Sequence, residues 1–240
     1  DSTAGGIWNA IREGSMRRLI LLCLLLSLRP VSAQRPVHFP VPNGQGEVQG
    51  DLYGAGTKAL ILAHGGRFTK ESWRSQAEEF AHAGFLVLAI RFRGDSLNPD
   101  GSPSSTGSAA DNADDVLAAA AYLRHMGART VSAIGASLGG DAVGDADARS
   151  APSTFDRIIL LGSAGGDAPA KLNGRKLFIV AREDRSASGL RLPTITERFR
   201  SASEPKRLVV LDGSAHAQFL FATSEGPLVI KTILNFLQAP

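Results

Sequence analysis

Six short apolar runs are spaced along the chain, and longer stretches with helical periodicity separate them. The clearest runs are FLVLAI at 85–90 and RIILL at 157–161. A strand that is apolar at almost every position is buried on both faces, which favours a parallel sheet covered by helices on both sides. Strands are predicted at 58–63, 85–91, 130–135, 157–162, 176–181 and 207–211. Helices are predicted at 70–82, 109–126, 138–148, 194–202 and 226–237.

An antiparallel hairpin is predicted ahead of this alternating pattern. Residues 38–41 and 47–53 flank the dipeptide Asn43-Gly44, which is a strong turn sequence. Together with the six parallel strands, the hairpin predicts an α/β fold whose mostly parallel sheet has eight strands, an antiparallel N-terminal hairpin and helices on both faces.

The N-terminal region has the pattern of a secretory signal. Residues 16–33 open with Met16 and the pair Arg17-Arg18, followed by an apolar core at 19–28 and the small-residue sequence Val-Ser-Ala before Gln34. This ten-residue core is too short to cross a bilayer, which takes about 20 residues, so no stable membrane anchor is expected. Residues 1–15 precede the predicted signal and are interpreted as a non-native upstream segment. The sequence therefore predicts one domain at 34–240 that is secreted or periplasmic.

Charge and cysteine content argue against a nucleic-acid partner, a disulfide and a cysteine metal site. The formal net charge is +3, and leaving out residues 1–33 lowers it to +1, which gives no case for a nucleic-acid partner. Cys23 is the only cysteine and lies in the predicted signal, so the mature chain would have neither a disulfide nor a cysteine metal site. The spacing of His38, His82 and His125 fits no metal site either. No metal or cofactor is implied.

Residues 135–139 spell G-A-S-L-G directly after a predicted strand. This pattern is typical of a serine at a sharp turn between a strand and a helix, where glycines avoid collisions in a strained backbone. The helix that follows directs its unpaired N–H groups at the serine, where they stabilise a developing oxyanion. Ser137 is therefore the candidate nucleophile.

A serine nucleophile of this kind needs a base and a carboxylate that orients the base. His216 is the only histidine after Ser137, and it follows the predicted strand 207–211. Asp184 follows the predicted strand 176–181 and is the preferred acid, with the adjacent Glu183 as an alternative. The order serine, acid, histidine is the one found on α/β-hydrolase sheets.

A second source of oxyanion N–H groups is predicted after the strand 58–63. His64-Gly65-Gly66 follow that strand and place flexible backbone beside the sharp turn, or elbow, that carries Ser137. His64 is predicted to shape this turn through local hydrogen bonds and is assigned no chemistry.

These motifs together resemble the α/β-hydrolase superfamily, nearest to its dienelactone-hydrolase-like and compact serine esterase groups. The resemblance covers residues 36–240. It implies Ser137 as nucleophile, Asp184 as acid, His216 as base, and the main-chain N–H groups of Leu138 and Gly66 as the oxyanion hole. Arg67 is an alternative to Gly66. Dienelactone hydrolases carry cysteine at the elbow and this chain carries serine, which argues against a dienelactone substrate.

The expected activity is hydrolysis of small carboxylic esters or other acyl substrates through an acyl-enzyme. The alternatives are an exopeptidase-like or acyl-transfer serine hydrolase, or a non-catalytic binding domain on the same fold. Residues 163–175 are few, small and mostly polar, so no helical lid is expected and short acyl groups are favoured.

Two further stretches allow separate predictions. Residues 94–107 are rich in Gly, Pro, Ser and Asp and are predicted to be a loop at the active-site edge, which either contacts substrate or only carries the chain onward. Asp141, Asp145 and Asp147 on the helix after the elbow are predicted to form a solvated face.

Overall fold

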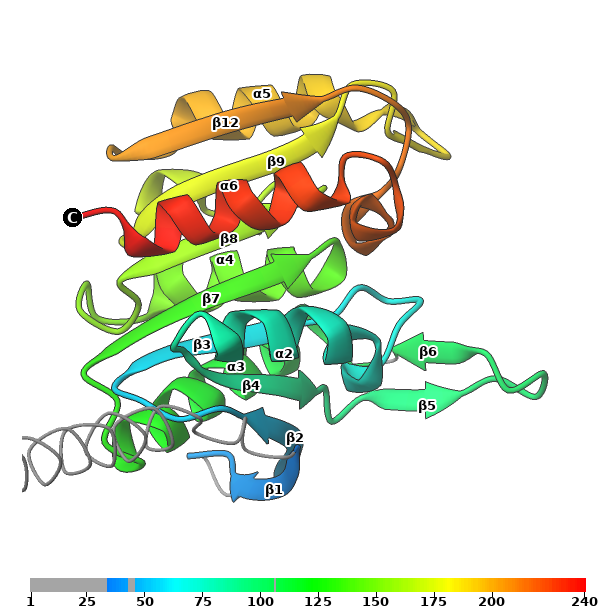
Figure 1. Cartoon of the computed structure of the whole chain (residues 1–240). Coiled ribbons are helices and arrows are strands. Elements are labelled where there is room, and N and C mark those ends of the chain that lie inside the picture. Colours follow the sequence, from blue (N-terminus) through cyan, green and yellow to red (C-terminus); the bar gives the residue numbers. More distant parts are fainter. Residues whose placement is uncertain (1–33, 43–45, 106) are drawn as a thin grey trace, which may run out of the picture. The chain divides into compact units, whose positions relative to one another are not determined.

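The computed structural model describes residues 34–42, 46–105 and 107–240 of the chain (Figure 1). The predicted upstream segment 1–15, the predicted signal peptide 16–33 and the predicted turn Asn43-Gly44 lie outside the described residues. A search of the described helices for one long and apolar enough to cross a bilayer finds none.

The main sheet contains eight strands in the order β1-β2-β4-β3-β7-β8-β9-β12. β2 pairs antiparallel with both β1 and β4, and every other neighbouring pair is parallel. The predicted mostly parallel sheet with an antiparallel N-terminal hairpin is confirmed. The strands are β1 (Arg35–Pro40), β2 (Glu47–Tyr53), β3 (Lys58–Ala63), β4 (Leu86–Arg91), β7 (Thr130–Ala136), β8 (Arg157–Leu161), β9 (Arg175–Ala181) and β12 (Lys206–Leu211).

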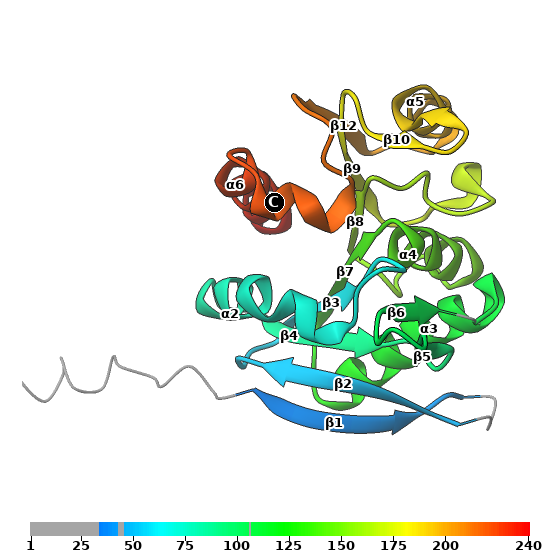
Figure 2. The same ribbon diagram turned by 90° about the vertical axis from the view of Figure 1, so that its right-hand side faces the viewer.

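Helices cover both faces of this sheet (Figure 2). One face carries α2 (Arg74–His82) and α6 (Gly226–Gln238). The other carries α3 (Ala109–His125), α4 (Leu138–Arg149) and α5 (Arg191–Ser201). The helix predicted at 70–82 begins as a 3-10 helix, η1 (Lys70–Trp73), before α2 continues it.

The strand β3 shows why the apolar runs are continuous. Leu60 packs with Trp73 and Phe80 in the core on the α2 and α6 side. Its neighbour Ile61 packs with Val116 in the core on the α3 and α4 side. Successive side chains of a strand point to opposite faces, so a sheet with two covered faces requires apolar residues at every position.

A small hairpin occupies most of the predicted loop 94–107. β5 (Asp95–Leu97) pairs antiparallel with β6 (Pro103–Ser105), and the hairpin extends from the edge where the parallel strands end (Figure 1). The Asn98 N–H donates to the Ser102 carbonyl oxygen at 2.9 Å and closes the turn. The predicted loop therefore contains two short strands that the sequence did not indicate, because local polar hydrogen bonds rather than apolar periodicity form the hairpin.

The remaining elements are short. They are the ribbon of β10 (Arg185–Ser186) with β11 (Gly189–Leu190), and the 3-10 helices η2 (Pro169–Lys171) and η3 (Ala217–Ala222). Between β8 and β9, where a lid would be inserted, the chain forms only η2.

The predicted solvated face of α4 is wrong at Asp147. Its side chain is fully buried and accepts hydrogen bonds from the N–H groups of Asn173 (2.6 Å) and Gly174 (3.2 Å). Burial raises the pKa of the Asp147 carboxyl. Asp141 is exposed as predicted, and it accepts a hydrogen bond from the Ser163 hydroxyl at 2.7 Å.

Candidate active site

The four predicted parts of the site lie just past the C-terminal ends of parallel strands. Gly66 follows β3, Ser137 follows β7, Asp184 follows β9 and His216 follows β12. In an open α/β sheet this edge is where ligands bind. The topology therefore gathers residues that are up to 150 positions apart in the sequence.

Ser137 sits on a strained turn between β7 and α4. Its φ of 50° and ψ of −116° are unusual for a residue with a side chain. A Cβ on Gly135 would lie 2.2 Å from the Gly139 carbonyl oxygen, and one on Gly139 would lie 2.3 Å from the Ala63 carbonyl oxygen. Both contacts are too short for any side chain, so the turn requires the two glycines of the pattern.

The side chains of Ser137, His216 and Asp184 form one hydrogen-bonded line. The Ser137 Oγ lies 2.8 Å from the His216 Nε2. The His216 Nδ1 lies 2.8 Å from the Asp184 Oδ2. A carboxylate only accepts hydrogen bonds, so the Nδ1 carries the proton and the Nε2 is free to accept from the serine hydroxyl. The structure thus brings together the three residues that the sequence pointed to.

The neighbouring acidic residues lie elsewhere. Asp184 is fully buried, whereas Glu183 is exposed and the side chain of Asp212 is 90% exposed. The Asp184 Oδ1, which faces away from the histidine bond, lies 3.4 Å from the Arg191 Nε. The buried carboxylate therefore has a cation on one side and the imidazole on the other.

Two segments offer main-chain donors beside Ser137. Leu138 is the first residue of α4, so its N–H has no acceptor within the helix. Gly66 lies next to it, because a Cβ there would be 3.6 Å from the Leu138 Cδ1. Among the described residues, none accepts a hydrogen bond from the N–H of Leu138, Gly66 or Arg67. Both predicted donors and the alternative, Arg67, are thus available to an oxyanion.

Side-chain hydrogen bonds hold the loop that carries Gly66. The Gly65 N–H donates to the Gln218 Oε1 at 2.8 Å, and Gln218 lies in η3, two residues after His216. The His64 Nδ1 lies 3.0 Å from the Gly65 carbonyl oxygen, the local bond that the sequence predicts. The His64 Nε2 lies 2.8 Å from the Asp95 Oδ2. No sequence signal pointed to Gln218 or Asp95, because they meet this loop from 153 and 31 positions away.

Ser137 opens onto two cavities. One, of about 230 Å³, is lined by His216 and by Phe68, Phe219 and Arg191. The other, of about 350 Å³, is lined by small and polar residues of α3 and α4, which include Ala109, Asn112 and Ala142. A substrate centred on the serine can therefore place a different group in each cavity.

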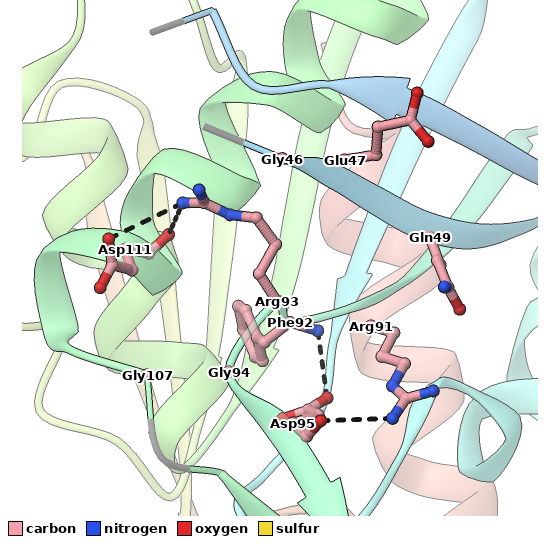
Figure 3. A pocket seen from close by; sticks show the side chains of 10 residues that line it. All are labelled: Gly46, Glu47, Gln49, Arg91, Phe92, Arg93, Gly94, Asp95, Gly107 and Asp111. Carbon is pink, nitrogen blue, oxygen red and sulfur yellow. Dashed lines mark hydrogen bonds and ion pairs between the residues drawn. The ribbon is translucent and has the colours of Figure 1, made fainter. Parts of the chain in front are cut away.

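A larger cavity, of about 590 Å³, lies beside the β5–β6 hairpin and is not lined by Ser137 (Figure 3). Two arginines of its lining have partners within the lining. Arg93 pairs with Asp111 at 3.8 Å, and the Arg91 guanidinium donates to the Asp95 carbonyl oxygen at 3.2 Å. Although this cavity is larger than the two beside Ser137, the candidate nucleophile does not line it.

No cluster of three or more His, Cys, Asp or Glu side chains suited to a metal ion occurs in the part of the chain that the structure describes. The line of Ser137, His216 and Asp184 needs no such ion for the chemistry of a nucleophile and its base.

Several solved structures share this fold. A dienelactone hydrolase from Anabaena variabilis is 22% identical with a TM-score of 0.66, covering 84% of this chain and 94% of its own. An esterase from Pyrococcus furiosus is 15% identical with a TM-score of 0.68, covering 85% of this chain and 92% of its own. A naproxen esterase, carboxylesterase NP, from Bacillus subtilis is 15% identical with a TM-score of 0.67, covering 89% of this chain and 94% of its own.

At these identities the likeness to solved structures establishes the fold. No curated protein matches the chain in sequence. Residues 58–238 match the family described as alpha/beta hydrolase fold, which includes the elbow and both partners of its serine. The chain therefore belongs to the α/β-hydrolase family.

Proposed function

We propose that the protein is a serine hydrolase that is exported to the periplasm or the medium and cleaves small carboxylic esters through an acyl-enzyme. The observation that carries this proposal is the line of two 2.8 Å contacts from Ser137 through His216 to the buried Asp184. The serine of this line sits on a strained elbow at the N-terminus of a helix.

In the acylation step, the Ser137 Oγ attacks the ester carbonyl while the His216 Nε2 takes the hydroxyl proton. The C–O bond to the alcohol then breaks, and His216 returns the proton to the leaving oxygen. Water repeats the sequence on the acyl-enzyme and releases the acid. Asp184 keeps the proton on the Nδ1 and stabilises the imidazolium that forms in each step.

The oxyanion of each tetrahedral intermediate binds the Leu138 N–H and the Gly66 N–H. The first belongs to α4, whose dipole adds positive potential at its N-terminus. Fixed donors of this kind are usually the largest single contribution to catalysis in acyl transfer.

The two cavities and the short segment between β8 and β9 support the substrate class. Only the 3-10 helix η2 lies between β8 and β9, and the cavity volumes suit compact groups rather than long acyl chains. Solved structures of the same fold include esterases, such as the naproxen esterase, which is consistent with this class.

A fluorophosphonate probe tests the proposal. We expect stoichiometric labelling that maps to Ser137, with none in Ser137→Ala. Ser137→Ala and His216→Ala should each lower kcat on a soluble p-nitrophenyl ester by roughly 10⁴-fold or more, and the double variant should lose no more, because triad members act as a unit. A folded wild-type chain that stays unlabelled and inactive would favour the non-catalytic binding domain.

The exopeptidase-like and acyl-transfer alternatives are separated by substrate. Peptide amides with a free terminus, and an added alcohol acceptor, should be run beside the ester panel. The proposed export is tested separately. Expression of the chain from Met16 should yield a periplasmic or secreted protein whose first residue is Gln34.

A further inference from the structure

A second pair of histidine and aspartate lies beneath the oxyanion loop. The His64 side chain has no exposed surface, and the Asp95 side chain is 5% exposed. The His64 Nε2 lies 2.8 Å from the Asp95 Oδ2, and its Nδ1 lies 3.0 Å from the Gly65 carbonyl oxygen. This pair takes no part in the proton transfers described above.

Both ring nitrogens of His64 face acceptors. A carbonyl oxygen only accepts, so the Nδ1 carries a proton and donates it to Gly65. On the opposite side of the ring, the Nε2 faces the Asp95 carboxyl group. The imidazole is therefore held between the Gly65 carbonyl oxygen and the Asp95 side chain.

The Gly65 carbonyl is in the same peptide unit as the Gly66 N–H. A hydrogen bond to that carbonyl fixes the plane of the peptide and draws electron density from its nitrogen, which makes the N–H a stronger donor. The preceding peptide unit is fixed as well, because the Gly65 N–H donates to the Gln218 Oε1 at 2.8 Å. The proposed oxyanion donor therefore sits on a peptide that the His64 side chain controls.

Asp95 is itself fixed from the other side. The Phe92 N–H donates to its Oδ2 at 3.1 Å, and the Arg91 guanidinium donates to its carbonyl oxygen at 3.2 Å (Figure 3). The Phe92 ring also packs edge-on against the imidazole, with 5.1 Å between centroids. The start of the β5–β6 hairpin thus forms a rigid base under His64.

We propose that His64 and Asp95 are positioning residues, which orient and polarise the Gly65–Gly66 peptide so that its N–H binds the oxyanion. The inference rests on the proposed function and adds to it a role for the hairpin. It predicts that the contact of His64 with Gly65 matters for the transition state and not for substrate binding.

Two substitutions separate the contacts of His64. The amide nitrogen of His64→Asn takes the place of the Nδ1 and keeps a donor for the Gly65 carbonyl. The amide nitrogen of His64→Gln takes the place of the Nε2 and keeps the contact with Asp95 only. Asp95→Asn keeps an acceptor for the Phe92 N–H and removes the charge. Asp100→Asn is the matched control, because it makes the same change at an exposed position of the same hairpin.

The variants are compared by kcat and KM on a soluble short-chain p-nitrophenyl ester and by inhibition with a boronic acid, which forms a tetrahedral oxyanion on the serine. His64→Gln should lower kcat and boronate affinity roughly 10- to 100-fold, less than removal of an oxyanion donor, with KM within about threefold of wild type. Asp95→Asn should lose roughly tenfold in kcat for the same reason. His64→Asn should retain several-fold more kcat than His64→Gln, and Asp100→Asn should match wild type.

Circular dichroism and thermal unfolding establish that each variant is folded. A folded His64→Gln with the kcat of wild type, equal kcat for His64→Asn and His64→Gln, or a loss confined to KM would each overturn the inference. If neither His64 variant folds, Asp95→Asn decides, and wild-type kcat there overturns it. An unlabelled and inactive wild-type chain would instead refute the proposed function, so the two failures are distinguishable.

Discussion

A single methyl group at Gly139 should disable the site without removing any reactive atom. In Gly139→Ala the new Cβ would lie 2.3 Å from the Ala63 carbonyl oxygen and 2.6 Å from the His64 carbonyl oxygen. Ordinary van der Waals contact begins at 3.4 Å, so α4 and the strand end must separate by about 1 Å. That separation moves the Leu138 N–H away from the Gly66 N–H.

The size of the effect follows from this distance. Displacement of catalytic groups by about 1 Å costs on the order of 100-fold in rate, so kcat should fall by roughly that factor. Overpacking of a buried site costs about 1–3 kcal/mol of the free energy of unfolding. For a domain of this size, each kcal/mol lowers Tm by about 2–4 °C, which predicts a fall of roughly 2–12 °C.

Gly144→Ala is the matched control for Gly139→Ala. It lies on the same helix, about 8 Å further along at 1.5 Å per residue, and its Cβ would lie 2.1 Å from the Gly165 carbonyl oxygen. We expect a similar fall in Tm with kcat on a soluble ester within about threefold of wild type. The steric clash is matched, and only its distance from the oxyanion donors differs.

Two results would refute this reasoning. A folded Gly139→Ala with the kcat of wild type would mean that the donors tolerate the displacement. An equal loss of kcat in Gly144→Ala would mean that general destabilisation, rather than the position of the donors, sets the rate.

Three other predictions follow from the site and from one buried charge. Asp184→Asn should lower kcat by about 10⁴-fold, because it favours the wrong tautomer of the triad histidine, while Glu183→Gln should be mild; the reverse order would move the acid to Glu183. Activity on p-nitrophenyl esters should fall from four-carbon to sixteen-carbon acyl groups at equal soluble concentration, and a rise would contradict the open cavities. Burial lowers the pKa of Lys176 from its usual 10.5, so as pH rises towards 10.5 the folded state releases this proton first and stability rises. Urea unfolding at pH 7 and pH 10 should show that Lys176→Met lacks this rise, and an unchanged rise would assign it to other groups.

The sequence predicted the parallel sheet well because burial on both faces leaves a continuous apolar signal. The strand β3 begins and ends at the predicted residues, and β4 begins one residue later than predicted. The positions of Ser137, Asp184 and His216 were readable for a related reason. Ser137 directly follows the strand β7, and the other two residues lie in the short loops after β9 and β12. Parallel strands bring their C-terminal ends to one edge of the sheet.

The contacts that sequence reasoning missed are those between segments without apolar periodicity. The burial of Asp147 depends on the path of residues 163–175 over α4, which small and polar residues do not reveal. The bond from His64 to Asp95 depends on a hairpin whose strands have only three residues each. Side-chain hydrogen bonds across such distances leave no pattern along the chain.

The outer strand β1 has a consequence for how the protein behaves at high concentration. Its sequence is RPVHFP, and Pro36 and Pro40 lack the N–H that a further strand would need. A proline on an edge strand keeps its nitrogen on the solvent side, and residues two and four positions apart point the same way. Along that side only His38 offers a backbone donor between the prolines. Addition of a foreign strand, the first step of amyloid-like assembly, is therefore disfavoured at this end of the sheet.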